Sequence, residues 1–204
     1  MTRRSYPKGL AKREEILATA LKVIAERGFG GATLRELAEA SNLSITGLVH
    51  HFGTKEQLLT EVLRRRDEVD ADAYEMDRLP ETAAAMIERL ATLVDRNAAV
   101  PGLVTLYSNL SADAAAPEHP SHEYFRERYE QSQDLGRDSL SHLQELGELP
   151  AGVDPGDLAQ LMIAAVDGLQ LLWQYDQSID MTRGLRALGA LLALANEGGR
   201  SADE

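Results

Sequence analysis

The segment from residue 33 to residue 55, TLRELAEASNLSITGLVHHFGTK, constrains the fold more than any other part of the chain. Thr33 is followed three residues later by Glu36, which is the spacing of a capping box at the start of a helix. Asn42 comes after this helix, and asparagine tolerates the left-handed backbone that a tight turn needs. Ser44 is suited to cap the next helix. Two short helices joined by a tight turn form a helix-turn-helix, which presents its second helix to the major groove of DNA.

The second of these helices is followed at once by the start of a third. Thr54 and Gln57 repeat the capping-box spacing. The helical period predicts that Leu48, Val49 and Phe52 point inward. The three helix starts therefore agree with one another, and the segment predicts a compact helical head.

The rest of the chain predicts an all-α protein, because no run of alternating β-branched residues indicates a sheet. Proline and glycine separate the expected helices, and Asp154 before Pro155 is suited to cap one of them. We expect an N-terminal arm and three-helix domain at residues 1–54, and a larger helical domain at residues 55–204. The predicted helices run at about 11–27, 34–40, 44–52, 55–76, 82–99, 101–112, 121–147, 155–175 and 182–196.

Charge is divided unevenly along the 204 residues. The net charge is −12, yet residues 1–66 have a balance of +5 and residues 67–204 a balance of −17. A basic end on an acidic body is typical of a protein that meets phosphate at one end only. The sequence has no cysteine, which excludes disulfides and thiolate sites, and no run that could serve as a signal peptide or bilayer span. We therefore expect a soluble cytoplasmic protein.

A resemblance to a known family rests on residues 13–59, REEILATALKVIAERGFGGATLRELAEASNLSITGLVHHFGTKEQLL. This stretch resembles the DNA-binding domain of tetracycline-repressor (TetR) family regulators. The remainder resembles them in layout, with a larger helical domain whose last two long helices pair with those of a second subunit. The resemblance implies a homodimeric transcriptional regulator that binds a pseudo-palindromic operator and responds to a small-molecule effector.

The resemblance also implies which residues meet DNA. Residues 44–52 would enter the major groove, Lys55 and Thr33 lie at helix starts suited to phosphate, and basic residues of the arm would add contacts. The predicted DNA-binding residues are Thr33, Ser44, Ile45, Thr46, Gly47, Val49, His50, His51 and Lys55, with Arg3, Arg4 and Lys8 in the arm.

Two positions depart from the family pattern. Val49 stands where the family usually has tyrosine, and Ile45 replaces a residue that is usually polar or basic. Either side chain is able to contact a thymine methyl group, and Val49 is alternatively able to pack inward. These departures bear on the operator sequence and not on DNA binding itself.

Metal and catalytic sites are weakly indicated. His50 and His51 are adjacent in a helix and do not share a face, so they do not chelate one ion together. His119, His122 and Glu123 offer three ligands within five residues, but a loop leading into a helix explains them equally well. We predict no enzyme activity, no cofactor and no metal.

The effector and the second subunit are predicted from the helical body. Asp167 and Gly168 interrupt an apolar helix, which is equally compatible with a ligand or interface contact and with a solvent-facing acid beside a close helix crossing. The predicted effector-site residues are Tyr107, Asn109, Asp167, Gln170 and Trp173. The predicted dimer-interface residues are Leu161, Leu169, Leu185, Leu188 and Leu192, with Leu191 and Leu194 forming a second apolar line.

The sequence thus predicts a homodimeric repressor released by a small-molecule effector. Two alternatives stay open, a ligand-binding helical protein with an unused DNA head and an all-α enzyme with an incidental helix-turn-helix. The identity of the effector, the operator, the regulated genes and the direction of regulation are not encoded in these patterns.

Overall fold

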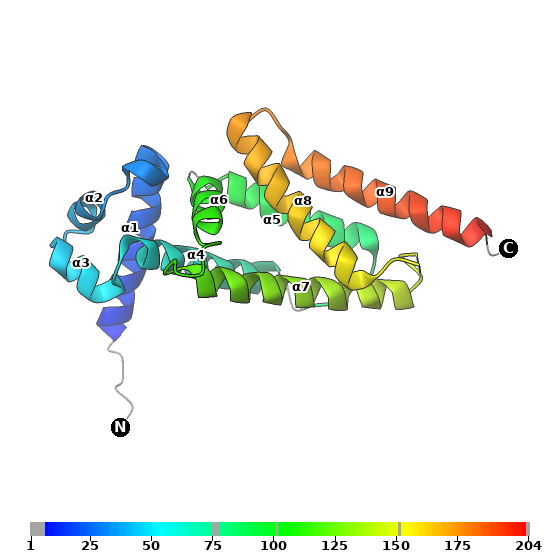
Figure 1. Ribbon diagram of the computed structural model, residues 1–204, viewed down its shortest axis with the longest axis horizontal. Helices are drawn as coiled ribbons and strands as arrows, with labels where there is room; N and C mark the ends of the chain where they lie inside the picture. Colours follow the sequence, from blue (N-terminus) through cyan, green and yellow to red (C-terminus); the bar gives the residue numbers. More distant parts are fainter. Residues whose placement is uncertain (1–6, 75–77, 101, 151, 203–204) are drawn as a thin grey trace, which may run out of the picture. The chain divides into compact units, whose positions relative to one another are not determined.

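The computed structural model describes residues 7–74, 78–100, 102–150 and 152–202, without the side chains of residues 7, 8, 72, 74 and 199–202. All regular elements in this part of the chain are α-helices, so the all-α prediction is confirmed (Figure 1). No helix among the described residues is both long enough and apolar enough to cross a bilayer. The helices are α1 (Pro7–Gly31), α2 (Leu34–Ala40), α3 (Ile45–Phe52), α4 (Lys55–Tyr74), α5 (Ala83–Ala98), α6 (Leu103–Asp113), α7 (His122–Glu145), α8 (Pro155–Tyr175) and α9 (Met181–Ala202).

Most helix ends fall within a few residues of the predicted ones, and α1 and α9 differ most. Helix α1 begins at Pro7 and continues beyond its predicted end, but Gly28 has a φ of 73° and breaks the helical path there. The glycine therefore kinks the helix, and one more turn follows it. Helix α9 runs on to Ala202, past the end predicted at residue 196. At α8, the Asp154 side chain accepts a hydrogen bond from the Asp157 N–H at 2.9 Å, as predicted from the Asp-Pro pair.

The chain folds into two compact units. The first unit comprises residues 1–68 and 100–124, and the second comprises residues 69–99 and 125–204. These units are defined by packing, and they cut through α4 and α7. The first unit therefore includes α6 and the first part of α4 in addition to the predicted three-helix domain. The predicted boundary at residue 54 separates DNA-binding from effector-binding residues, and it stays a prediction.

The core of the first unit is built around α1. Ile16, Ala20 and Ile24 line its inner face and are almost fully buried. Leu48 of α3 and Leu58 of α4 are equally inaccessible to solvent. Helices α1 and α2, α2 and α3, and α1 and α6 pack against one another.

The contact between α1 and α6 depends on a glycine. Gly102 precedes α6 with a φ of 79°, and a Cβ added there would lie 2.9 Å from both Cα and N of Ala25. The backbone of α6 thus approaches the backbone of α1 more closely than any side chain allows.

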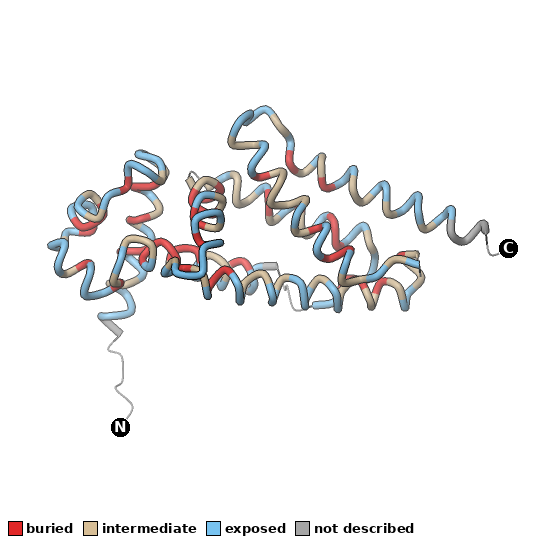
Figure 2. Tube along the Cα trace, viewed as in Figure 1, coloured by how far each residue is buried: buried red, intermediate tan, exposed pale blue. Residues whose placement is uncertain are grey.

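The core of the second unit forms two clusters of aliphatic side chains and methionine. One joins α5, α7 and α8 through residues such as Ile87, Leu140 and Met162. The other joins α5 to the first part of α9 through Val94 and Leu185. Helix α9 packs along α5 and against α8. Figure 2 shows the buried positions of α9 gathered near its start, with exposed and intermediate positions along the rest.

The predicted dimer-interface residues are mostly used inside the monomer. Leu185 is only 1% exposed and belongs to the α5–α9 cluster. Leu169, Leu188 and Leu192 are half-buried and pack against the same two clusters, so of the five predicted residues only Leu161 is exposed. The helical period identified the apolar line of α9 correctly, but that line faces the core and not the solvent.

A different set of apolar side chains faces outward. On α9 these are Leu191 and Leu194, both 64% exposed, on the flank away from Leu185. On α8 an outward stripe follows the spacing i, i+4, i+7, i+11, i+14. Its members are the exposed Leu161, Leu172 and Tyr175 and the half-buried Ala165 and Gly168.

Candidate nucleic-acid interface

The first helix of the helix-turn-helix begins with the predicted capping box. The Thr33 hydroxyl accepts from the Glu36 N–H at 3.3 Å, and the Glu36 carboxylate accepts from the Thr33 N–H at 2.9 Å. These backbone and hydroxyl bonds from Thr33, and then the Arg27 guanidinium, hold the pKa of Glu36 below its ordinary value. The turn that follows contains Asn42 with a φ of 54°, which confirms the left-handed conformation predicted for it.

The second helix, α3, is capped at both ends. The Ser44 hydroxyl accepts from the Gly47 N–H at 3.0 Å. Gly53 follows α3 with a φ of 80°, where a Cβ would overlap the amide of Gln57. That amide oxygen instead accepts from the Thr54 N–H at 2.9 Å and completes the second predicted capping box.

The side chains of α3 form parallel rows, because a helix turns by about 100° per residue. Leu48 and Phe52 form the buried row. Thr46 and His50 form the row on the opposite side, and both are exposed. The outward face of α3 is therefore polar along its centre.

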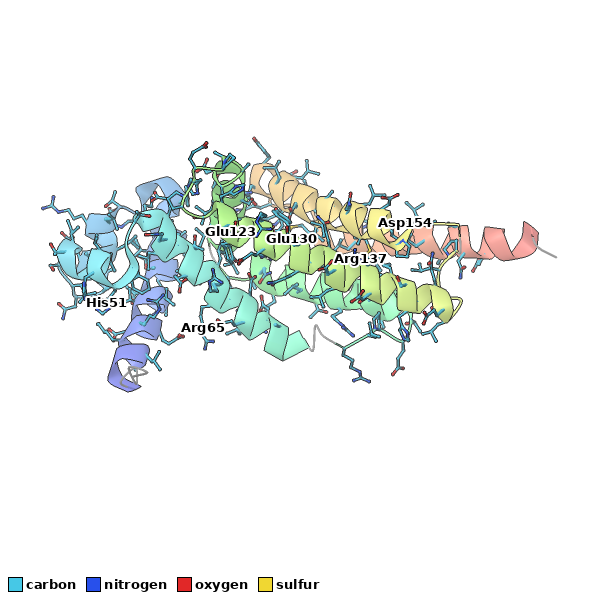
Figure 3. The ribbon with its side chains drawn as sticks, turned by 60° about the horizontal axis from the view of Figure 1, so that its bottom comes forward. His51, Arg65, Glu123, Glu130, Arg137 and Asp154 are labelled. Atoms are coloured by element: carbon cyan, nitrogen blue, oxygen red, sulfur yellow. The ribbon has the colours of Figure 1, made fainter. Side chains whose placement is uncertain are left out.

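Two further rows flank the polar one. Ile45 and Val49 form an apolar row, with 47% and 41% of each residue exposed. Gly47 and His51 form the other row, and His51 lies at the exposed side near the end of α3 (Figure 3). The inward orientation predicted for Val49 is wrong, since the turn of the helix places it beside Ile45 and away from Leu48.

Basic residues of α1 hold the ends of α2 and α3. Lys12 Nζ donates to the carbonyl oxygen of Ser41 at 3.2 Å, at the end of α2. The Arg13 guanidinium donates to the carbonyl oxygen of His51 at 3.2 Å, lies 4.5 Å from the centre of the Phe52 ring, and pairs with Glu61. A cation is favourable at a helix C-terminus, so Lys12 stabilises the end of α2 and Arg13 stabilises the end of α3. No local pattern predicts these contacts, because the partners lie far away in the sequence.

The two predicted phosphate-binding residues are also engaged in the protein. Lys55 Nζ donates to the carbonyl oxygen of Phe29 at 3.0 Å and lies 5.0 Å from the centre of its ring. The Thr33 hydroxyl donates to the Glu36 carboxylate at 2.9 Å. To donate to a phosphate, the Thr33 hydroxyl therefore has to give up its bond to Glu36, whereas the Lys55 ammonium has further N–H donors.

The positive balance of the N-terminal residues is partly neutralised by ion pairs. Arg65 bonds to Glu68 at 3.1 Å and to Glu14 at 2.8 Å, and these hydrogen bonds raise the pKa of its guanidinium. Arg27 bonds to Glu36 at 2.6 Å. The predicted arm residues Arg3 and Arg4 lie outside the described residues, as does the side chain of Lys8. The charge balance thus overstates the cationic groups that the described part of the first unit offers to DNA.

Comparison with known proteins agrees with this geometry. Residues 16–62, which run from α1 into α4, match the family model described as "Bacterial regulatory proteins, tetR family". The matched part of the chain belongs to the TetR family. Two curated members are similar to it, the HTH-type transcriptional repressors KstR2 of Mycolicibacterium smegmatis and AcnR of Corynebacterium efficiens.

The similarity to these two TetR-family repressors covers part of each protein. KstR2 is 34% identical over 83 residues, which are 41% of this chain and 40% of KstR2. AcnR is 37% identical over 81 residues, which are 40% of this chain and 43% of AcnR. The matched part thus spans about two fifths of the length of these curated relatives. The solved structure of the fatty acid degradation regulator FadR from Bacillus halodurans shares the fold, with a TM-score of 0.73 at 19% identity over 94% of this chain and 97% of that one.

The predicted effector-site residues fall into both units of the chain. Tyr107 is buried on α6 in the first unit, whereas Asn109 on the same helix is exposed and donates to the carbonyl oxygen of Thr105 at 2.8 Å. Asn109 is therefore not in the interior of its unit. Asp167, Gln170 and Trp173 all belong to α8 in the second unit.

Three polar side chains of α8, Asp167, Gln170 and Gln174, lie on the side opposite to its outward stripe. Asp167 accepts a hydrogen bond from the Tyr129 hydroxyl of α7 at 2.7 Å. Gln170 is buried, and Gln174 Nε2 is buried without a hydrogen-bond partner among the described residues. Gly168 belongs to the outward stripe, where a Cβ would meet nothing within 4 Å. The Asp-Gly pair thus combines an internal hydrogen bond with a small residue on the surface.

The three candidate metal ligands are parts of the loop before α7 and its first turn. His119 Nδ1 accepts from the Ser121 N–H at 3.1 Å, and His122 Nδ1 lies 2.8 Å from the carbonyl oxygen of Ala114. Glu123 lies in the first turn of α7, where a carboxylate is favourable. The described residues contain no group of three histidine or acidic side chains placed to hold a metal ion.

Proposed function

We propose that the chain is a DNA-binding transcriptional regulator that acts as a homodimeric repressor and is released by a small-molecule effector. The observation that carries this proposal is the outward face of α3, which has a polar row of Thr46 and His50 on a helix capped at both ends. The match to the TetR family over residues 16–62 supports the same interpretation. Because its partner is DNA, we place the protein in the cytoplasm.

In this proposal α3 enters the major groove and the neighbouring helix starts meet the phosphates. Thr46 and His50 donate to or accept from base edges at the centre of the contact. The groups proposed to meet phosphate are Lys55, Thr33, His51 and the arm residues Arg3, Arg4 and Lys8. Because Arg13 and Lys12 hold the ends of α3 and α2, they position the contact without having to touch DNA.

We further propose that α8 and α9 form a four-helix interface with a second copy of the chain. The support is the apolar surface that the monomer leaves open, above all Leu172 on α8 and Leu191 and Leu194 on α9. Gly168 would let a partner helix approach α8 closely. A dimer brings two recognition helices to two half-sites, which a single short helix cannot specify alone.

The effector is proposed to bind in the helical body, with α8 supplying polar contacts. Gln170 is a buried amide, and the buried Nε2 of Gln174 is a donor suited to a carbonyl or carboxylate oxygen of a ligand. Trp173 lies at the edge of the α5–α9 cluster and would contact the apolar part of the effector. Helix α4 contributes residues to both units, so it is the proposed connection between ligand and DNA.

Effector coupling of the usual size, about 1–3 kcal/mol, changes operator affinity roughly 5- to 150-fold. We therefore expect a compound that raises the melting temperature of the protein to weaken its binding to the operator. Operator affinity that is the same with and without every such compound would contradict the effector proposal.

The main test measures binding to the DNA that flanks the protein's own gene. Fluorescence polarisation at about 0.1 M salt compares this DNA with a shuffled sequence of equal length. We expect specific binding by the wild type and a loss of at least about 30-fold in the double variant Thr46→Ala with His50→Ala, because two base contacts of about 1–3 kcal/mol each contribute at least about 2 kcal/mol. Binding to the shuffled DNA should change little.

A matched control is Thr92→Ala, which removes an exposed threonine hydroxyl from α5 in the second unit. It should bind the operator as the wild type does. Equal affinity of the wild type for flanking and shuffled DNA would contradict the proposed function, as would an unchanged affinity of the double variant.

A further inference from the structure

The apolar row of α3 is out of place on a surface proposed to meet DNA. Ile45 and Val49 lie four residues apart on one side of the helix and are 47% and 41% exposed. The row borders directly on the polar row of Thr46 and His50. Exposure of an apolar pair to water is unfavourable, so a pair on the DNA-facing side is stabilised by contact with an apolar group in the groove.

The major groove offers one apolar group on its base edges, the C5-methyl group of thymine. We infer that Ile45 and Val49 contact two thymine methyl groups in each half-site and thereby select the operator sequence. This inference rests on the proposed function and adds the class of DNA sequence that the protein prefers. Two branched side chains form too small a surface for a stable protein interface, which needs about 800 Å² from each partner.

The spacing of the pair fixes the spacing of the thymines. Side chains four residues apart on a helix have Cβ atoms about 5–6 Å apart. Successive bases on one strand rise by about 3.4 Å, so two methyl groups within two base steps match this distance. The preferred half-site therefore contains two thymines, on either strand, no more than two steps apart.

The neighbouring exposed residues at the start and along the outer face of α3 offer no other large apolar side chain for this contact. Gly47 has no side chain, and Ser44 is occupied by the N–H of Gly47 at 3.0 Å. Thr46 and His50 lie in the central exposed row and are proposed to meet the hydrogen-bonding groups of the bases. The helix thus separates polar from apolar contacts by row.

The first step of the test is selection of bound sequences from random DNA with the full-length protein, followed by affinity measurement on the selected operator. The second step replaces each conserved thymine with deoxyuridine, which removes the methyl group alone. We expect each replacement to weaken binding about fourfold, the effect of one buried methyl-sized group. Replacement of a thymine outside the half-sites is the control and should have no effect.

The third step assigns the methyl groups to side chains. Val49→Ala and Ile45→Ala should each bind the thymine operator more weakly and lose sensitivity to deoxyuridine at one position. Thr46→Ala should also bind more weakly but keep the full sensitivity at both positions. Because all three side chains are exposed, the variants should melt within a few degrees of the wild type.

Each remaining outcome contradicts a different statement. Specific binding that is insensitive to deoxyuridine would overturn the methyl contact and leave the proposed function in place. Sensitivity that persists in both alanine variants would overturn the assignment to Ile45 and Val49. No enrichment of any sequence in the first step would overturn the proposed function itself, together with this inference.

Discussion

The two units of the chain specify their surfaces in different ways. In the first unit, the short helices α2 and α3 are held by hydrogen bonds from α1 to their ends in addition to the burial of Leu37 and Leu48, as between Arg13 and the carbonyl of His51. In the second unit, long helices are placed by burial of leucine and methionine, and apolar side chains such as Leu191 remain on the outside. Where hydrogen bonds hold the helix ends, single residues determine the position of the surface. Where burial holds the helices, the surface depends on how much apolar area stays exposed to solvent. The two units should therefore respond differently to substitution.

We expect the largest effect on operator affinity from substitutions of the exposed leucines of α9. The double variant Leu191→Glu with Leu194→Glu should be monomeric in sedimentation velocity experiments, because unpaired carboxylates in an apolar interface cost several kcal/mol. Operator affinity should fall on the order of 100-fold, since one half-site is then bound at a time. Thermal stability of the isolated monomer should change little, because both leucines are exposed.

The control for this variant is Leu135→Glu, which places the same charge at an exposed leucine of α7 outside the outward faces of α8 and α9. It should remain dimeric with full operator affinity. The proposal that α8 and α9 form the dimer interface would be contradicted by a wild-type protein that sediments as a monomer or by a double variant that stays dimeric.

A smaller effect is expected from a single backbone position in the first unit. Gly102→Ala adds a Cβ 2.9 Å from the backbone of Ala25 at a φ of 79°. We expect a loss of about 1–3 kcal/mol in the free energy of unfolding, because the residue is strained and α6 must move away from α1. Urea denaturation monitored by circular dichroism measures this loss.

Gly30→Ala is the matched control within the same unit. A Cβ at Gly30 meets nothing within 4 Å, and alanine favours helix more than glycine does. This variant should be as stable as the wild type or slightly more stable. Equal stability of both variants would mean that α1 and α6 do not depend on close backbone approach.

Sequence alone predicts the features of this chain that are local. The caps at Thr33, Ser44 and Asp154 involve partners three residues away, so the residue types and their spacing identify them. The turn at Asn42 is predicted for the same reason, because the preference for a positive φ belongs to that residue.

Contacts between distant segments are not predicted in this way. Nothing near Arg13 indicates that it will meet His51, and nothing near Gly102 indicates that it will touch Ala25. The helical period finds both apolar flanks of α9, but it cannot say which one faces the core, since this depends on how α5 packs. The period therefore predicts Leu185 at the interface, whereas the structure buries this residue between α5 and α9.

The smallest expected effect compares the two capping boxes of the first unit. Thr33–Glu36 contains an ionisable side chain, whereas Thr54–Gln57 has the same hydrogen bonds from a neutral amide. The pKa of Glu36 is held below its ordinary value of 4.5 by the backbone N–H and the hydroxyl of Thr33 and by Arg27. Because this pKa is lower in the folded state, the carboxylate stabilises the fold fully above pH 4.5, and the stabilisation is lost as the pH falls through the folded-state value.

Glu36→Gln converts the first box into a copy of the second and removes its titration. We expect the wild type to have the higher urea midpoint at about pH 7, because the charged carboxylate also interacts with Arg27 and with the start of α2. The difference between the two midpoints should shrink as the pH is lowered through the window below 4.5, whereas other acidic groups, such as Glu88 paired with Arg186, affect both proteins equally. Parallel midpoints at every pH would show that the charge of Glu36 contributes nothing, and that the first helix of the motif is held by the geometry of its cap alone.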